Sequence, residues 1–305
     1  MKRRVLCLLL LAALAIPAFA LGGTAAPAKS GSAPVAENLE LETYRGVSVG
    51  GRLSASDPDG DLAGFELTTP PVKGEVTIAP DGSFVYTPEA GRRGRDYFGY
   101  KAVDAAGNRS QEATVIVRLK KQSSPVGYAD MAGSGAAYAA AYLAEAGIFQ
   151  GRSVAGQYVF EPDAAVSREE FLAMSMAAAG QPLLSGVTRT GFADDEAIDA
   201  WAKPCVATAL MNGVVSGYSA QGGAVFRPEE GIRVWEAAAV LDRLLRITDV
   251  TLRETDEAVP VWAAQPEANL RACRLLPDTL RGEDMLTRAD CAQLLLAAVQ
   301  LLERR

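Results

Sequence analysis

Two arginines stand directly after residues that favour helix starts, and their position could create a binding site for an anion. Arg168 follows Ser167 in the run VSREE, and Arg288 follows Thr287 in the run LTRAD. Ser and Thr are preferred N-cap residues, so each arginine would lie in the first turn of a helix. The helix dipole disfavours a cation there by a few tenths to about 1 kcal/mol. A helix N-terminus beside an arginine fork suits a carboxylate or a phosphate. The alternative is a solvated surface arginine.

Acidic residues complete these two turns, and a third turn departs from the pattern. Glu170 and Asp290 stand three residues after the capping hydroxyls, which predicts capping boxes. In the run IRVWE, Arg233 replaces the hydroxyl, Val234 replaces the arginine, and Glu236 keeps the acidic position. Either the site at Arg233 does not bind an anion, or Arg233 supplies the positive charge from the position before Val234.

The composition excludes several other kinds of chemistry. The 305 residues include no histidine, which removes Ser-His-Asp and Cys-His catalysis and the commonest zinc sites. The motifs CxxC and GxxxxGK are also absent. A carboxylate pair needs no histidine, but no spacing singles one out, so we predict no catalytic residue and no enzyme. The formal net charge of −7 makes nucleic acid an unfavourable partner, because duplex binding usually needs a basic face.

The turns at Ser167 and Arg233 belong to a repeat with a period of 66 residues, and the turn at Thr287 repeats its last part a third time. Its first copy contains Gly147, Gly151, Phe160, Pro162 and Glu170, and these match Gly213, Gly217, Phe226, Pro228 and Glu236. A fixed period predicts stacked units of the same local structure. We therefore expect helical copies over 128–180, 192–246 and 255–303. The third copy is degenerate, because it lacks the Gly-rich loop and the Phe-x-Pro of the other two.

Each copy should contain two helices. The expected helices are 136–146 and 167–180, a helix that ends at Gly213, 233–246, a helix near 267–275, and a last helix with Cys291, Leu294, Leu295, Ala298 and Leu302 on one stripe. Asp130 and Asp194 should cap the first helices, with a place in a ligand groove as the alternative. Trp201 and Trp262 stand at the starts of first helices and should be core residues; the alternative is stacking on sugar faces.

The part before residue 128 follows a different pattern. A basic start, a short apolar run and an A-x-A site predict a cleaved secretory signal over 1–20. A flexible linker follows over 21–36, and a second linker covers 120–127. Between them, seven short alternating runs over 37–119 predict an antiparallel β-sandwich. No later apolar run is long enough to span a bilayer, so we expect no transmembrane segment after signal cleavage.

Two further groups of residues leave alternatives open. Clustered carboxylates at Asp57, Asp59, Asp61 and Asp104 could bind Ca²⁺ as the only cofactor; the alternative is an Asp/Gly turn whose side chains cap their own backbone. Three cysteines follow the signal, an odd number that leaves at least one unpaired. The last two of them could pair, or all three could be free thiols.

Two known families share these motifs. Over 34–119 the DPDGD turn, the PP-x-x-G-x-V strands, the DGSFxYTP hairpin and the closing DxxGN resemble the bacterial cadherin-like, Ig-like repeat. This resemblance implies a spacer or adhesive unit. From residue 128 on, the aromatic-x-Asp starts, the Trp-Ala pairs, Gly-x-x-x-Gly, Phe-x-Pro and the Thr-Arg-Ala-Asp-like turns resemble the S-layer homology (SLH) module. This second resemblance implies three modules packed around a pseudo-threefold axis.

The SLH resemblance also implies a ligand. In that family the turn with the arginine helps to bind a secondary cell-wall polysaccharide, commonly through a pyruvylated sugar, in grooves between neighbouring modules. The positions that match are Arg168, Arg288, Arg233, Gly147, Gly213, Asp130, Asp194, Glu170 and Glu236.

These observations predict a secreted, non-enzymatic protein of the bacterial cell wall or S-layer. The helical copies would anchor it non-covalently to an anionic wall polysaccharide, and the sandwich would be held outward. Other envelope proteins or a second copy of the chain are further expected partners. The alternative is a calcium-dependent adhesin or S-layer assembly protein in which the sandwich is the functional part.

Overall fold

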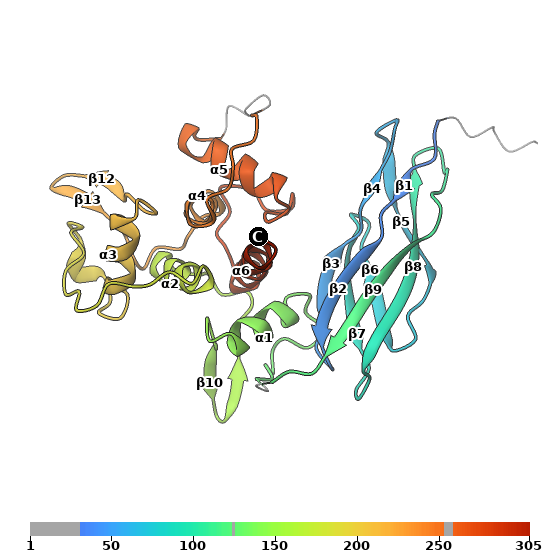
Figure 1. Cartoon of the computed structure of the whole chain (residues 1–305), viewed down its shortest axis with the longest axis horizontal. Helices are drawn as coiled ribbons and strands as arrows, with labels where there is room; N and C mark the ends of the chain where they lie inside the picture. The colour runs from blue at the N-terminus through green and yellow to red at the C-terminus, as the bar shows by residue number, and fades with distance from the viewer. Residues whose placement is uncertain (1–30, 124–125, 253–258) are drawn as a thin grey trace, which may run out of the picture.

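The computed structural model describes residues 31–123, 126–252 and 259–305, which form a β-sandwich and a group of helices (Figure 1). The expected secretory signal over 1–20 lies outside the described residues. The strands of the sandwich are β1 Val35–Ala36, β2 Leu39–Tyr44, β3 Val49–Arg52, β4 Ala55–Ser56, β5 Leu62–Thr69, β6 Gly74–Ile78, β7 Ser83–Pro88, β8 Gly94–Asp104 and β9 Ala113–Lys120.

Two sheets face each other, with strand orders β2-β9-β8-β5 and β3-β7-β6. The prediction of an antiparallel sandwich is wrong for one pair, because β2 and β9 run parallel, with Leu39 opposite Val115. Alternation along a strand shows which face is buried but not the direction of the neighbouring strand. The strand β1 pairs with β4 and lies in the stretch 21–36 that was expected to be a flexible linker.

The core of the sandwich follows the predicted alternation. In β9 the side chains of Ala113, Val115 and Val117 are buried, and the residues between them are more exposed. The core also contains the fully buried aromatic side chains of Tyr86, Phe98 and Tyr100.

The helical part contains the expected pairs of helices. Its helices are α1 Ala137–Glu145, α2 Arg168–Ala178, α3 Lys203–Met211, α4 Val234–Leu245, α5 Val261–Ala272 and α6 Arg288–Glu303, with a short 3₁₀ turn at Asp195–Ala197. The helix α5 begins earlier than predicted and continues through Pro266, which cannot donate the hydrogen bond of its turn. The predicted stripe of α6 is buried from Cys291 to Ala298.

The loops between α1 and α2 and between α3 and α4 contain β-hairpins, which were not predicted. The first hairpin is β10 Arg152–Val154 with β11 Gln157–Val159, and the second is β12 Tyr218–Ala220 with β13 Gly223–Val225. A glycine with positive φ lies at each tip, Gly156 at 81° and Gly222 at 102°. This glycine was the available signal for a tight turn.

The starts of α2, α4 and α6 meet at one place through a closed cycle of backbone hydrogen bonds. The N–H of Val166 donates to Leu286, that of Leu286 to Ile232, and that of Ile232 to Val166, at 3.0–3.1 Å. All three side chains are buried. Each copy therefore contacts both of the others directly at the residue before its N-cap.

The third copy lacks the Phe-x-Pro motif, as predicted, but it keeps a turn with the same backbone contacts. The N–H of Glu169 donates to Pro228 at 3.1 Å, that of Ala289 to Pro162 at 2.9 Å, and that of Trp235 to Gly282 at 3.0 Å. The run Leu280-Arg281-Gly282 thus takes the place that Phe-x-Pro has elsewhere. Without the phenylalanine and the proline, no sequence motif marks this turn.

The sandwich packs directly on α1 (Figure 1). Tyr138 is 3% exposed and belongs to the core cluster of the sandwich, with its ring 5.1 Å from that of Tyr44. Its N–H donates to Ser48 at 3.0 Å, and the N–H of Gly50 donates to Gly135 at 2.8 Å. A Cβ on Gly50 would lie 3.1 Å from Gly135, so this contact depends on the glycine.

The three described cysteines form no disulfide bond. Cys205, Cys273 and Cys291 are free, and the first and last are buried. Among the described residues we find no helix with the length and apolar character that a membrane crossing requires.

Candidate functional site

The predicted capping boxes are present at the starts of α2 and α6. Ser167 Oγ accepts from the N–H of Glu170 at 3.2 Å, and the Glu170 carboxylate accepts from the N–H of Ser167 at 3.0 Å. Thr287 and Asp290 make the same pair at 3.2 and 3.1 Å. These caps fix the position of the arginine that follows each N-cap.

Arg168 is buried at the contact between the first and second copies, which we call the Arg168 junction. It is 8% exposed, and its Nη1 lies 2.7 Å from Glu236 Oε2. Its guanidinium lies 4.9 Å from the ring centroid of Tyr218. The buried Nε has no hydrogen-bond acceptor among the residues that the structure describes. Arg168 is therefore not a solvated surface arginine, and its buried Nε is unsatisfied within the described part of the chain.

A pocket of about 330 Å³ opens at the Arg168 junction. Its walls come from α2, α4, the segment 214–218 and the start of α5, and its polar and aromatic lining residues are Arg168, Ser216, Tyr218, Phe226, Glu236, Arg243 and Trp262. Burial opposes the ionisation of Glu236, but hydrogen bonds from the Arg233 backbone, Tyr218 and Arg168 outweigh it and lower its pKa. The pocket thus brings together one buried arginine and one carboxylate.

Arg288 lies at the contact between the third and first copies, which we call the Arg288 junction. Its side chain is 14% exposed, and its Nη1 lies 2.5 Å from Glu161 Oε2 and 3.3 Å from the Phe160 carbonyl. Its Nη2 lies 3.9 Å from Glu170, and the guanidinium lies 5.5 Å from the ring centroid of Phe149. This arginine is already engaged by carboxylates of the chain.

The contact between the second and third copies, the Val234 junction, contains no arginine at the equivalent position. Arg233 keeps only the backbone half of the capping box, since its N–H donates to Glu236 at 2.9 Å, and its exposed side chain donates to the Glu283 carbonyl at 2.7 Å. The indole of Trp235 packs on Gly282, where a Cβ would come within 1.6 Å of it. Arg233 therefore does not place a charge where Val234 stands.

Asp130 and Asp194 do not cap the first helices, which corrects that prediction. Asp130 accepts from the N–H groups of Phe160 and Glu161 at 2.9 and 2.6 Å. Asp194 accepts in the same way from Phe226 and Arg227 at 2.8 and 2.7 Å. Each carboxylate ties the start of its copy to the Phe-x-Pro turn some 30 residues later. A side chain that bonds so far along the chain gives no local sequence signal.

The glycines of the site allow backbone conformations and contacts that a side chain would prevent, as predicted. Gly147 and Gly213 both have a φ of 70° directly after α1 and α3, the left-handed conformation that ends a helix. A Cβ on Gly151 would lie 2.5 Å from the Val159 carbonyl, and one on Gly217 would lie 2.7 Å from the Val225 carbonyl. These glycines let the hairpin close beside each junction.

The two tryptophans that were predicted to be core residues are exposed. Trp201 is 55% exposed, and its indole N–H donates to Asp199 at 2.8 Å. Trp262 is 51% exposed and lines the pocket beside Arg168. The start of the first helix is a solvent-facing edge in both copies, which periodicity within the helix could not show.

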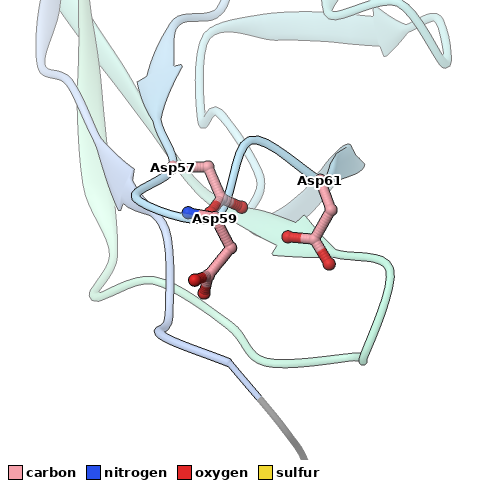
Figure 2. A group of neighbouring side chains, drawn as sticks. All are labelled: Asp57, Asp59 and Asp61. Carbon is pink, nitrogen blue, oxygen red and sulfur yellow. The ribbon is translucent and has the colours of Figure 1, made fainter.

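Three of the four predicted calcium ligands lie together. The carboxylates of Asp57, Asp59 and Asp61 come from one short loop after β4, with oxygens within 4.8 Å of one another (Figure 2). Asp57 Oδ2 is buried and has no hydrogen-bond partner among the described residues. Desolvation, followed by the charges of Asp57 and Asp104, raises the pKa of Asp61. The Asp104 carboxylate accepts from the backbone and side chain of Asn108, both at 2.7 Å, and lies outside this group.

Comparison with known proteins identifies both parts of the chain. Residues 31–121 match the bacterial cadherin-like domain, and residues 127–172 match the S-layer homology domain. No curated protein sequence matches this chain.

Solved structures resemble the chain only weakly. The SrpA adhesin of Streptococcus sanguinis is 18% identical over 33% of this chain and 62% of its own, with a TM-score of 0.25. The fibronectin(III)-like modules of Clostridium thermocellum CbhA are 17% identical over 29% and 47%, with a TM-score of 0.23. Human protocadherin-24 EC1-2 is 14% identical over 32% and 58%, with a TM-score of 0.25. The chain thus spans less than two thirds of each of these structures, and the scores carry no argument about it.

The first match covers the sandwich and the second covers the first of the three helical copies, and neither family is enzymatic. The chain therefore carries a bacterial cadherin-like domain followed by an S-layer homology domain, both of which are domains of surface proteins.

Proposed function

We propose that this protein attaches non-covalently to an anionic polysaccharide of the bacterial cell wall, and that the pocket at the Arg168 junction is the binding site. The observation that carries this proposal is a buried arginine whose Nε has no acceptor among the described residues and which lines an open pocket. A buried charged donor without a partner is costly, and a ligand carboxylate would remove that cost.

The same pocket suits a sugar. The half-exposed indole of Trp262 supplies a flat apolar face on which a sugar ring can stack, next to the charged groups. A pyruvate ketal on the sugar would supply the carboxylate for Arg168. Since Glu236 already neutralises part of the arginine charge, selectivity would come from the direction of the Nε–H and the shape of the pocket.

The architecture that forms this site is three SLH modules around a pseudo-threefold axis. The closed cycle of hydrogen bonds through Val166, Ile232 and Leu286 supports this arrangement, because each copy makes the same contact to the next. The proposal includes secretion, a location in the cell wall or S-layer, and a spacer or adhesive role for the sandwich. Other envelope proteins or further copies of the chain would be its partners, and no catalysis is involved.

Sedimentation with purified cell-wall sacculi tests this function. The chain from residue 21 to 305 should sediment with sacculi and remain in the supernatant after mild acid has removed the pyruvate ketals. Arg168→Ala should lower the apparent affinity at least about tenfold, because a charged hydrogen-bonded contact is worth about 2–5 kcal/mol, and Trp262→Ala should lower it by a smaller factor. Arg189→Ala, which removes an exposed arginine elsewhere, is the matched control. Equal binding by the wild type and Arg168→Ala would rule out this site.

A second candidate function is calcium-dependent adhesion through the sandwich. The observation that favours it is the orphaned Asp57 Oδ2 within the cluster of three carboxylates, since oxygen-rich clusters of this kind suit Ca²⁺. Asp57, Asp59 and Asp61 would hold the ion, which would offset their mutual repulsion and rigidify the loop.

Addition of Ca²⁺ should stabilise the sandwich by about 2.7 kcal/mol when its concentration is 100 times the dissociation constant. Differential scanning calorimetry with and without EDTA measures this shift. Asp59→Asn should abolish most of the shift, whereas Asp163→Asn, an exposed aspartate in the helical part, should retain it. If the melting temperature of the wild type does not change with Ca²⁺, the calcium site is excluded.

A further inference from the structure

The two junctions that have an arginine differ at one position of the Phe-x-Pro turn. Glu161 stands between Phe160 and Pro162, and Arg227 stands between Phe226 and Pro228. The backbone is the same at both positions, with a φ of 58° and 57°, a left-handed conformation that is rare for residues other than glycine. The same turn thus presents a carboxylate to one junction and a guanidinium to the other.

At the Arg288 junction the chain supplies its own carboxylate. Glu161 is bound by Arg288 at 2.5 Å and also by Arg152 from β10. Hydrogen bonds from Arg152 and then from Arg288 lower the pKa of Glu161, so it is ionised at neutral pH. An external carboxylate could reach the Arg288 guanidinium only by displacing Glu161 from two cations.

At the Arg168 junction an arginine stands at the position of Glu161, and the carboxylates near Arg168 are those of Glu236 at 2.7 Å and Glu230 at 3.8 Å. Tyr218 occupies the position of Arg152, and Arg227 occupies the position of Glu161, as the period of the repeat shows. The guanidinium of Arg227 lies 4.7 Å from the Tyr218 ring, which also lies 4.9 Å from that of Arg168. The nearest carboxylate to Arg227 is that of Glu230, at 3.5 Å and 58% exposed. Two guanidinium groups therefore converge on one ring beside the pocket.

The Val234 junction is filled by side chains. Trp235 donates its indole N–H to Glu267 at 2.7 Å, and Arg271 binds the same carboxylate at 2.7 Å and the Leu280 carbonyl at 2.9 Å. This junction has no arginine at the Val234 position, and the indole of Trp235 packs closely on Gly282.

We infer that the residue between Phe and Pro selects the junction that accepts the anionic saccharide, so that Arg227 opens the Arg168 junction and Glu161 closes the Arg288 junction as a built-in carboxylate. This inference rests on the proposed function and deepens it, because it assigns one ligand site to a chain that has three junctions. Glu161 acts as an internal competitor that occupies the place of the ligand carboxylate.

Isothermal titration calorimetry with a soluble probe tests the inference on the chain from residue 21 to 305. The probe is a methyl hexosaminide that carries a pyruvate ketal, and the same glycoside without the ketal is the control ligand. The wild type should bind one probe per chain. Glu161→Gln, which keeps the size of the side chain and removes its charge, should add a second site. Arg227→Glu should lower the affinity of the original site at least about tenfold.

Two further variants identify the sites. Glu161→Gln combined with Arg288→Ala should return the stoichiometry to one, and Arg288→Ala alone should bind one probe with an affinity within about twofold of the wild type. Two equivalent sites in the wild type, or a single site in Glu161→Gln, would overturn the inference and leave the proposed function standing. No heat from the wild type with this probe would overturn both.

Discussion

Replacement of Tyr138 by alanine should lower the free energy of unfolding by about 3–5 kcal/mol, the usual cost of removing a large buried aromatic side chain. The ring of Tyr138 comes from α1 but lies in the core of the β-sandwich against Tyr44. Its hydroxyl donates to Glu42 at 3.0 Å, so the substitution also leaves this interface carboxylate without that donor. The substitution should therefore weaken mainly the interface between the sandwich and the helices.

Two probes separate the domains in a urea titration. All three tryptophans, at positions 201, 235 and 262, lie in the helical part, so their fluorescence reports helical unfolding alone. Circular dichroism also reports the sandwich. In the wild type the two transitions should coincide, and in Tyr138→Ala they should separate, because the domains are no longer coupled. Tyr158→Ala removes a 38% exposed tyrosine from β11 and is the matched control. Coincident and unshifted transitions in Tyr138→Ala would show that the interface contributes nothing to stability.

Replacement of Asp130 by alanine should destabilise the first copy by about 2–4 kcal/mol. The carboxylate accepts two backbone N–H groups, and hydrogen bonds to charged groups are worth about 1.5–3 kcal/mol each. We take a value below the full sum because Asp130 is exposed to solvent. The amides of Phe160 and Glu161 lose their acceptor, and the Phe-x-Pro turn loses its tie to the start of the copy.

Hydrogen exchange locates this effect. The amides of Phe160 and Glu161 should exchange faster in Asp130→Ala than in the wild type, whereas those of the second copy should not change. Asp130→Asn keeps one acceptor oxygen and should give an intermediate loss. Asp163→Ala, an exposed aspartate that follows the same turn, is the control and should leave exchange unaffected. If Asp130→Ala and Asp163→Ala behave alike, the carboxylate does not hold the turn.

The features that sequence predicted well are those set by residues close together in the chain. The capping boxes of Ser167 and Thr287 depend on a partner three residues away. The strands of the sandwich follow from alternation within each run, and the left-handed turn at Gly147 follows from the end of one helix. The 66-residue period added the relation between copies. These local preferences were enough to distinguish the two parts of the chain, because the residues of each motif interact with one another directly.

The features that sequence could not predict depend on partners far apart in the chain. Only the tertiary structure pairs Arg288 with Glu161, 127 residues earlier, and Asp130 with the turn at Phe160, 30 residues later. It also places β2 parallel to β9 and the side chain of Tyr138 inside the sandwich.

The sequence by itself thus determined that two arginines stand at helix starts in a threefold repeat. The tertiary structure decided that one of them lines an open pocket beside Glu236 and that the other is bound by Glu161. The physical reason is that a helix cap is fixed by its own turn, whereas the charge that surrounds an arginine is fixed by whichever copy packs against it.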